Sequence, residues 1–397
     1  MIRQRPLLSI ATGVMVLVCI FAGVGHPRAQ DSLAAAVDSL GAFEFSTRMA
    51  ASRTIRRASS AEAVPVLTAA VKNHNDSYVR YRALVLLAGF DDKNTADVIA
   101  SVLGDRNDRL RAVAYEWFER YAGTATVSAL PNLVNLIDAL PTESSEFVRP
   151  SLMRALAAMH ADPRARAAVA PLITSGEDFF RSEVIQALGD YKATWAAPAI
   201  MSVAKLDGPL QDDAVLALGK LGDASALPVL AELQRQAARE RLPAIAAAIC
   251  MLGVNCDGHH KYLDDTLRFT VANAGYRVLL RTASHATGAF AARGDQAAFK
   301  SLLDVGIGAA DDQARAPIAL ALGAAAVAQP AALMAALAAR STDQAAAIEL
   351  LRDAFDMLEE DFAEEMFYVA VRRSYWTASE GSQARRLAEA VLQKLEF

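Results

Sequence analysis

The feature that most constrains the fold of this chain is an apolar pattern that recurs along most of its length. Counting from Arg181, apolar or small residues follow four, seven and eight positions later, at Ile185, Leu188 and Gly189. These offsets place the side chains on one face of an α-helix. The same pattern begins at Arg80, Arg111, Arg149, Gln211, Arg241, Arg315 and Gln344. Most of these starts lie about 30 residues apart, a period that is typical of stacked helix–turn–helix repeats.

Each copy of the pattern carries further helix signals. The first helix ends at a small residue, as in the segment from Gly219 to Gly222, because glycine readily adopts the left-handed conformation that ends many helices. A second helix follows, often with proline in its first turn, where the N–H groups have no intrahelical partner. Pro65, Pro198 and Pro228 are examples. The sequence therefore predicts pairs of helices.

An acidic residue precedes several of the recurring arginines. These residues are Asp76, Asp108, Glu146, Asp178 and Asp312. A charge pair that recurs once in each repeat indicates a structural ladder, because a catalytic site has no reason to repeat with the fold. We expect the pairs to tie neighbouring turns together and to cap the first helices.

Composition agrees with a helical chain. Hydrophobic residues make up 53% of the 397 residues and aromatic residues only 7%, with alanine runs at 246–248 and 324–326. Alanine is the best helix former. Alternating runs of β-branched and aromatic residues are nearly absent, so no sheet is expected. The net charge of −5 and the scattered Lys and Arg residues argue against a nucleic-acid partner.

The N-terminus has the three parts of a secretory signal sequence. Arg3 and Arg5 form a positive segment, residues 7–24 are largely apolar, and small or turn-forming residues follow. We expect residues 1–30 to be a signal peptide that is cleaved near Ala29, and the mature protein to be periplasmic or secreted. The alternative is an uncleaved N-terminal membrane anchor, because the apolar stretch approaches the roughly 20 residues that a membrane helix needs.

Removal of the signal peptide would leave Cys250 and Cys256 as the only cysteines. In an oxidising compartment such a pair indicates a disulfide. Six residues along an unbroken helix separate two Cα atoms by about 9 Å, whereas a disulfide needs them within about 7 Å. We therefore expect the helix to end at Gly253, which would reverse the chain. The alternative is a pair of free, partly buried thiols.

Two stretches carry a resemblance to a known family. Residues 181–191 and 214–230 resemble the short HEAT repeats first grouped with phycobilisome lyases, and the second stretch contains that family's Ala-Leu-Gly and Leu-Gly-Asp core. The likeness extends more loosely over residues 46–180 and 314–344. It implies an all-α fold, a right-handed α-solenoid of HEAT-like helix pairs over residues 31–344, in which the second helices line a concave face.

Two other stretches depart from the pattern. Residues 257–313 lose the repeat phase, and residues 345–397 become charged and aromatic. A terminal repeat needs a polar outer face, so we interpret residues 345–397 as a helical cap. Loss of the phase frees side chains from packing, so a specific binding patch is expected within 257–313. Its candidate residues are His259, His260, Tyr262, Asp265, Arg268 and Arg281.

No motif for catalysis or metal binding stands out. His259 and His260 are adjacent, so they point in different directions on a helix, and the H-E-x-x-H spacing is absent. Deoxyhypusine hydroxylase, which is also built from HEAT-like repeats, holds two irons through His-Glu pairs. None of the 6 histidines here is followed by Glu. We therefore expect no catalytic residue, no metal and no cofactor.

These features predict an exported, non-enzymatic binding or scaffolding protein that holds a protein partner on its concave face. The alternative is a lyase-like or tetrapyrrole-handling accessory enzyme, although phycobilin lyases act on cytosolic light-harvesting proteins. An absorption spectrum of the purified protein distinguishes the two classes, because a bound chromophore would favour the second.

Overall fold

Helices follow one another from Pro27 to Leu395 in the computed structural model, which describes residues 27–395 apart from 91, 93, 125–132 and 359–360. No strand occurs in this described part of the chain, so the predicted all-α fold is confirmed. The apolar stretch of residues 7–24, on which the predicted signal sequence depends, lies outside the described residues.

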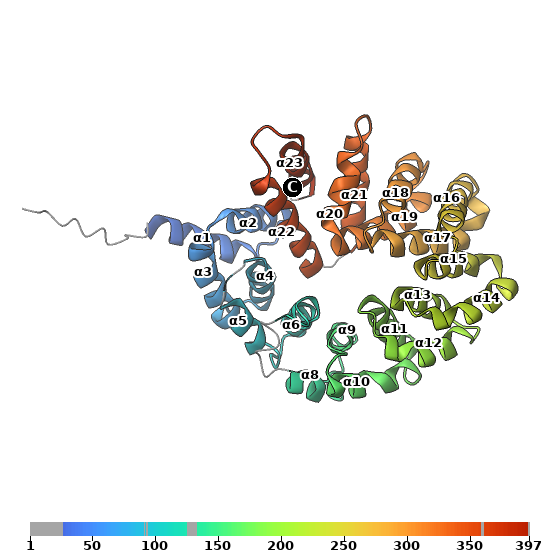
Figure 1. Ribbon diagram of the computed structural model, residues 1–397. Coiled ribbons are helices and arrows are strands. Elements are labelled where there is room, and N and C mark those ends of the chain that lie inside the picture. Colours follow the sequence, from blue (N-terminus) through green and yellow to red (C-terminus); the bar gives the residue numbers. More distant parts are fainter. Residues whose placement is uncertain (1–26, 91, 93, 125–132, 359–360, 396–397) are drawn as a thin grey trace, which may run out of the picture.

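The helices form a two-layered solenoid that curves until its two ends meet, so that the chain makes a ring (Figure 1). The inner layer consists of α4 (Ser77–Ala88), α6 (Asp108–Arg120), α9 (Arg149–Ala158), α11 (Asp178–Asp190), α13 (Gln211–Leu221), α15 (Leu242–Met251), α17 (Arg277–Ala291) and α19 (Asp312–Ala328). The outer layer consists of α3 (Ser60–Asn73), α5 (Thr95–Ser101), α8 (Leu133–Ala139), α10 (Pro163–Val169), α12 (Ala197–Ala204), α14 (Leu227–Gln236), α16 (Cys256–Ala272) and α18 (Gln296–Gly308).

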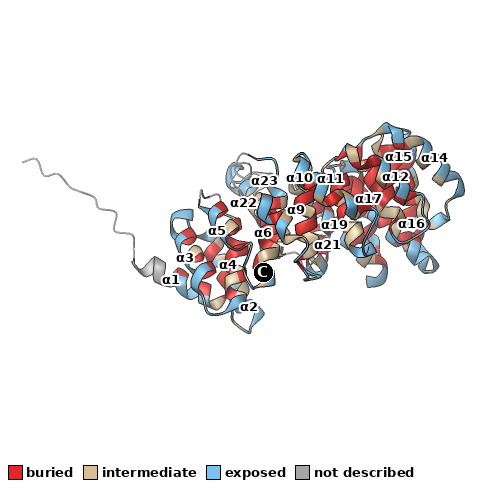
Figure 2. Cartoon of the chain, turned by 90° about the horizontal axis from the view of Figure 1, so that it is seen from below, coloured by how far each residue is buried: buried red, intermediate tan, exposed pale blue. Residues whose placement is uncertain are grey.

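The remaining elements lie at the two ends and in the turns. The N-terminal end has α1 (Pro27–Ser39) and α2 (Phe45–Arg57), and the C-terminal end has α20 (Pro330–Ala338), α21 (Gln344–Leu358), α22 (Asp361–Thr377) and α23 (Gln383–Leu395). Short 3-10 helices precede several α-helices: η1 (Ala170–Ile173), η2 (Thr194–Ala196), η3 (Ala224–Ala226), η4 (Arg239–Arg241) and η5 (Ala274–Tyr276). Buried residues fill the space between the two layers around the ring (Figure 2).

The order of the two layers differs from the expectation. The helices that follow or contain the recurring Arg or Gln line the inside of the ring, and the helices that come next in each repeat, such as α12 and α14, lie outside (Figure 1). Counted from the recurring arginine, the first helices and not the second ones form the concave face. The reason lies in the small residues of the first helices, which let them approach one another along the shorter inner circumference.

The recurring Arg or Gln binds a backbone carbonyl at the end of the preceding helix or in the turn that follows that helix. Arg80 donates from Nε to the carbonyl oxygen of Val71, at 2.8 Å, and Gln211 donates to that of Ala204, at 3.0 Å. Arg111, Arg149, Arg181, Arg315 and Gln344 make the corresponding bonds to Asp105, Glu143, Ile173, Ala309 and Leu337. The last carbonyl groups of a helix have no intrahelical partner. These bonds explain why the pattern begins with a long donor side chain in each repeat.

The expected ladder of acidic residues is present only in part. Asp108 pairs with Arg111 at 3.2 Å, and Asp178 pairs with Arg181 at 2.8 Å. Asp76 instead accepts a hydrogen bond from the backbone N–H of Tyr78 and caps α4. The acidic residues thus serve the helix starts in two ways, as ion-pair partners and as caps.

Glycines bring neighbouring inner helices into close contact. A Cβ atom on Gly219 would lie 2.6 Å from the Cα atom of Ala248 on α15, and one on Gly189 would lie 2.9 Å from the Cα atom of Ala217 on α13. Gly219 lies inside α13 and does not end the helix, although the sequence pattern also allowed the helix to end there. Gly222 ends α13, with a φ of 76°. Gly288 on α17 repeats this contact within residues 257–313, so the stacking continues where the sequence pattern is lost.

The ring closes where α22 meets α2 and α4. Arg56 donates to Glu365 from Nε at 2.9 Å and from Nη2 at 2.6 Å, and Arg372 donates to the other carboxylate oxygen at 3.0 Å. Glu365 is only 1% exposed. Burial alone would raise the pKa of Glu365, but the two guanidinium groups outweigh it and hold the pKa below its usual range. The Arg56 guanidinium also lies over the ring of Tyr368.

A second contact of the junction is centred on Asp361. This carboxylate accepts hydrogen bonds from the hydroxyl of Tyr81 and from Arg82, both on α4. Burial, and then the charge of Asp361, raise the pKa of Tyr81, so its hydroxyl stays protonated and keeps donating. At this junction Glu365 is buried between the two ends of the chain and Asp361 is half-buried, and the role of residues 345–397 as a helical cap stays a prediction.

Within the described residues no single helix is long and apolar enough to cross a membrane. Helices α19 and α20 meet that test only when taken together, and they are bent by 116° where they join.

Replacing Gly219 with valine is expected to lower the free energy of unfolding by about 1–3 kcal/mol, because the added side chain forces two packed helices apart. Urea denaturation followed by circular dichroism measures the change. The matched control is G104V, because a Cβ on Gly104 meets nothing within 4 Å. Equal midpoints for the two variants would contradict the close approach of α13 and α15.

The variant E365Q is expected to open the ring, because loss of one partner of a buried ion pair costs about 3–5 kcal/mol. Small-angle X-ray scattering would show a larger radius of gyration, whereas E232Q, at an exposed carboxylate on α14, would leave it unchanged.

The same carboxylate makes ring closure depend on pH. Because closure lowers the pKa of Glu365, its contribution to stability is complete above the pKa of about 4.3 that it has in the unfolded chain, and is lost as the pH falls through its lower pKa in the folded chain. A wild-type ring that opens at pH 6 would contradict this assignment.

Candidate binding surface on the inner face

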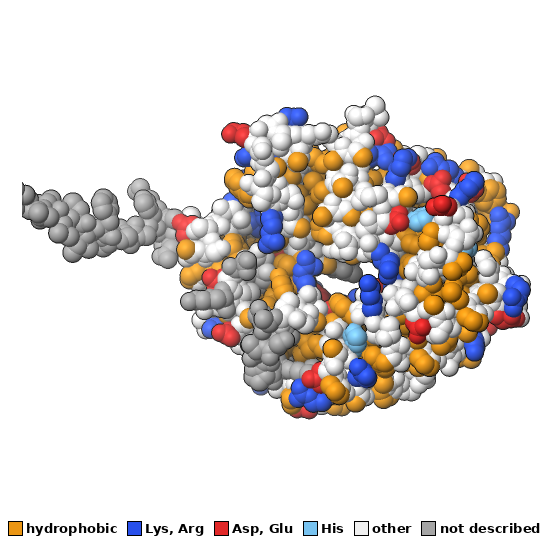
Figure 3. All heavy atoms as spheres, in the orientation of Figure 1, with side chains coloured by type: hydrophobic (Ala, Val, Ile, Leu, Met, Phe, Trp, Pro, Cys, Tyr) orange, Lys and Arg blue, Asp and Glu red, His pale blue; other side chains and the backbone are white. Residues whose placement is uncertain are grey.

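The inner surface of the ring is built from the side of each inner helix that turns away from the outer layer. The residue five positions after the recurring Arg or Gln lies on this side, since those four and seven positions after it are buried between the layers. These residues are Glu116, Arg154, Gln186, Leu216, Ala246 and Leu320. At this position α6, α9 and α11 carry polar side chains and α19 carries the exposed Leu320, whereas Leu216 of α13 and Ala246 of α15 are buried. Figure 3 shows a central opening with Lys and Arg side chains gathered around it.

Arg154 is the centre of the polar half. Its guanidinium lies 2.9 Å from Glu119 of α6 and 3.4 Å and 3.7 Å from Asp190 and Glu183 of α11. The hydroxyl of Tyr191 also donates to Glu119, at 2.9 Å. Lys220 of α13 extends the network by pairing with Asp190 at 2.7 Å. One connected set of charges thus joins four consecutive inner helices.

The surrounding protein shifts the acid–base equilibria of this network. Burial alone would lower the pKa of Arg154, but Glu119, Asp190 and Glu183 outweigh it and raise the pKa, so the guanidinium stays charged. Burial raises the pKa of Glu183, and Arg154 only partly opposes this. The carboxylates are therefore crowded, and a further cation would stabilise their charged forms.

Helix α13 adds Asp212 and Asp213 to the polar half. Arg241 lies 3.3 Å from Asp212, and the hydroxyl of Ser182 donates to Asp213 at 2.7 Å. His285 of α17 faces the same two carboxylates from the other side. Burial within the ring lowers the pKa of His285, although Asp213 works against this, and burial raises the pKa of Asp212. The imidazole is thus held toward its neutral form.

The opposite part of the wall is apolar on α19, whereas α17 also carries the exposed Arg281 one turn before His285. Leu320 of α19 is 48% exposed, and the exposed Ala324 follows one turn later. Val278, at the start of α17, is 50% exposed. Apolar side chains that remain exposed on a concave surface are available to a ligand.

The two edges of the solenoid differ in charge. Successive inner helices run in the same direction, because an outer helix returns the chain between them, so their N-termini share one edge, here called the start edge. Exposed carboxylates there belong to Asp76, Asp108, Glu146, Glu177, Asp178, Asp207, Asp311 and Asp312, against the exposed bases Arg106, Arg109, Arg239 and Arg277. The C-terminal ends of the inner helices carry Arg120, Lys192, Lys220 and Arg293, against the carboxylates Glu119 and Asp190. Both preferences match the helix macrodipole.

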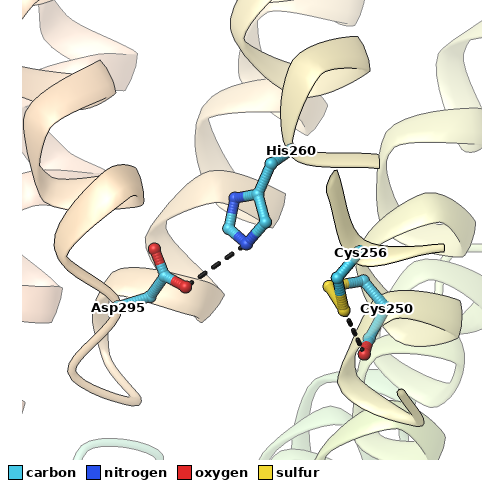
Figure 4. The surroundings of a disulfide bond; sticks show 4 residues. All are labelled: Cys250, Cys256, His260 and Asp295. Carbon is cyan, nitrogen blue, oxygen red and sulfur yellow. Dashed lines mark hydrogen bonds and ion pairs between the residues drawn. A yellow bond between two sulfur atoms is a disulfide. The ribbon is translucent and has the colours of Figure 1, made fainter. Parts of the chain in front are cut away.

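The six residues of the predicted patch lie on two regular helices. His259 is buried on α16, where burial lowers its pKa. His260 stacks on Phe290 with ring centroids 4.6 Å apart, and its Nε2 lies 3.3 Å from the carboxylate of Asp295 (Figure 4). Tyr262 is half-buried, and Arg281 is exposed on α17.

The structure brings only two of the six together. His260 and Arg268 line one cleft of about 280 Å³ between α16 and α18. Asp265 pairs with Lys261 and Arg268 pairs with Asp264 along the exposed side of α16. A binding role for the six residues stays a prediction. His285 was not among the residues predicted from the sequence, yet it faces the charged network of the inner wall.

The structure joins Cys250 and Cys256 in a disulfide, with Cα atoms 4.5 Å apart (Figure 4). Helix α15 ends before Gly253, which has a φ of 86° and reverses the chain, and Asn255 is also left-handed. The expected reversal at Gly253 is thus present. In the described ranges no three His, Cys, Asp or Glu side chains are arranged to hold a metal ion.

Comparison with known proteins agrees with this architecture. Residues 33–119 match the model of HEAT repeats, and residues 210–236 match that of the PBS lyase HEAT-like repeat. The chain is an α-solenoid protein. It contains HEAT repeats over residues 33–119 and, over residues 210–236, a repeat of the short type named after phycobilisome lyases. A search of curated proteins gave no match.

Several solved structures are similar at low identity. The complex of CpcE and CpcF of phycocyanin lyase from Nostoc sp. PCC7120 has a TM-score of 0.39 and 20% identity, over 67% of this chain and 96% of that chain. Kap121p bound to Nup53p has a TM-score of 0.36 and 13% identity, over 93% of this chain and 40% of that one. A structure concerned with the interaction between cadherin and beta-catenin has a TM-score of 0.31 and 12% identity, over 93% of this chain and 95% of that chain.

Thiol titration of denatured, unreduced protein is expected to find neither Cys250 nor Cys256 free, because the two residues are joined. Reduction before denaturation should expose two thiols and lower the stability by about 2 kcal/mol, the modest effect expected of so short a loop. Two free thiols in the unreduced sample would reject the bond.

Proposed function

We propose that the chain is a non-enzymatic binding protein that holds a segment of a partner protein on the inner face of its ring. One observation carries this proposal: a connected polar half around Arg154 and an apolar half around Leu320 share one central opening. A partner segment with one polar and one apolar side would contact both halves at once.

The charge of the polar half indicates which polar groups such a segment presents. Three cations, Arg154, Lys220 and Arg241, face a larger set of acids: Glu119, Glu183, Asp190, Asp212 and Asp213. Burial is the main cause of the raised pKa values of Glu183 and Asp212, and neighbouring carboxylates raise them further. A Lys or Arg of the partner would return both pKa values toward normal, which favours binding.

The proposal places the protein outside the cytosol, in the periplasm or beyond the cell. The pattern of residues 1–30 supports export, and the disulfide of Cys250 and Cys256 is suited to an oxidising compartment. The partner is accordingly expected to be an envelope or secreted protein.

Site-specific photocrosslinking in the native cells tests this proposal. A photoreactive amino acid is placed on the inner face at Gln186, His285 or Leu320, and on the outer layer at Glu232 or Lys261 as a control. All five positions retain solvent contact. We expect adducts with the same protein from the three inner positions and none from the two outer ones, detected as a mass shift on a denaturing gel.

Adducts from the outer positions alone, or none at all, would contradict binding on the inner face. The same preparation yields the absorption spectrum that tests the alternative function. A visible band that co-purifies with the protein and is lost in an inner-face variant such as L320E would favour tetrapyrrole handling instead.

A further inference from the structure

A second exposed surface lies on the start edge, outside the inner wall. Phe147 and Phe179 each stand two residues before a recurring arginine, so they occupy the same position in adjacent repeats. Their exposed fractions are 90% and 58%. Leu206, in the loop that leads to α13, is 61% exposed. We call these three residues the aromatic strip. Large apolar side chains that gather at one edge instead of being scattered mark an interaction surface.

A cleft opens beside the aromatic strip, between α9 and the start of α11. Its volume is about 160 Å³, and its walls include Met153, Leu172 and Phe180. The guanidinium of Arg149 lies 5.1 Å from the centre of the Phe180 ring and forms one side. An apolar side chain of a partner could enter this cleft while the rest of its segment lies across Phe147 and Phe179.

Carboxylates surround the aromatic strip. Glu146 adjoins Phe147, and Glu177 precedes Phe179 by two residues; both are exposed, and neither forms an ion pair with a residue that the structure describes. Asp207, next to Leu206, is 97% exposed and lies 3.5 Å from Arg241. The strip thus presents large apolar groups beside the carboxylates of Glu146 and Glu177, which are unpaired within the described residues, and the exposed Lys205 adjoins only its Leu206 end. Anionic membrane surfaces and nucleic acids would be repelled by these carboxylates.

The geometry points to the aromatic strip and its cleft as a docking site for a cationic amphipathic helix of a partner protein. The apolar side of that helix covers Phe147, Phe179 and Leu206, and its Lys or Arg residues face Glu146, Glu177 and Asp207. Charge complementarity selects this occupant, since exposed aromatic anchors supply affinity and the carboxylates determine the sign of the partner. This site is independent of the inner-face site, because Phe147 and Phe179 lie on the start edge and not on the wall.

Two synthetic peptides test the docking site on the full chain. One is an amphipathic helix of Leu and Lys, and the other carries Glu in place of every Lys. Fluorescence anisotropy measures binding of each to the wild type, to F147S/F179S, to E146Q/E177Q and to the matched control F43S, which alters a phenylalanine that is 94% exposed elsewhere. Circular dichroism and thermal melting verify that each variant is folded, as expected for changes at exposed positions.

We expect the Lys peptide to bind the wild type and F43S equally. F147S/F179S should weaken binding at least about tenfold, as expected when two anchor residues are removed. E146Q/E177Q should weaken it at low salt and reduce the salt dependence. The Glu peptide should not bind.

The proposal is overturned by unchanged binding to F147S/F179S, by equal binding of the Glu peptide, or by failure of the Lys peptide to bind the wild type. Two further measurements identify other occupants. Sedimentation showing self-association that F147S/F179S abolishes would assign the strip to a second copy of the chain. Cosedimentation with phosphatidylcholine vesicles that F147S/F179S abolishes would assign it to a membrane. Either result would also reject the proposed helix.

Discussion

The close approach of the inner helices is the constraint on which the ring depends. Gly189, Gly219 and Gly288 present bare backbone to alanines of the next inner helix, so the inner layer repeats over a shorter distance than the outer layer. A two-layered stack with unequal spacing must bend toward its shorter side, and the bend accumulates with each repeat. Here it accumulates until α22 reaches α4, so the charged junction at Glu365 exists because of packing far from it.

Features that depend on near neighbours in the sequence were predictable. The apolar phase that starts at Arg181 predicts the helices, and the placement of Gly253 between two cysteines predicts a chain reversal. Ring closure was not predictable in this way. Arg56 and Glu365 are 309 positions apart, and their contact is the sum of many small rotations between repeats, none of which the spacing of residues specifies.

The residues of the inner wall could not be predicted from the sequence for a related reason. The charged residues of this wall come from positions such as Glu119, Arg154 and His285, between one and three from each helix, so they are spread over a long stretch of the chain. A search for irregular segments led instead to α16, whose polar residues mostly pair with one another on the outer side. The position five residues after the recurring Arg or Gln is a usable signal only in part, because it marks the wall at Glu116, Arg154 and Leu320 but is buried at Leu216 and Ala246.

Closure also changes the mechanics of the solenoid. An open stack has a free end, so a small rotation between two repeats simply swings that end through space. In a ring the rotations around the circuit must sum to a fixed total, so a change between α9 and α11 has to be compensated at other repeats or at the contact of Asp361 with Arg82. The ring therefore transmits a local rearrangement to every repeat, as a closed linkage of bars does and an open chain of bars does not.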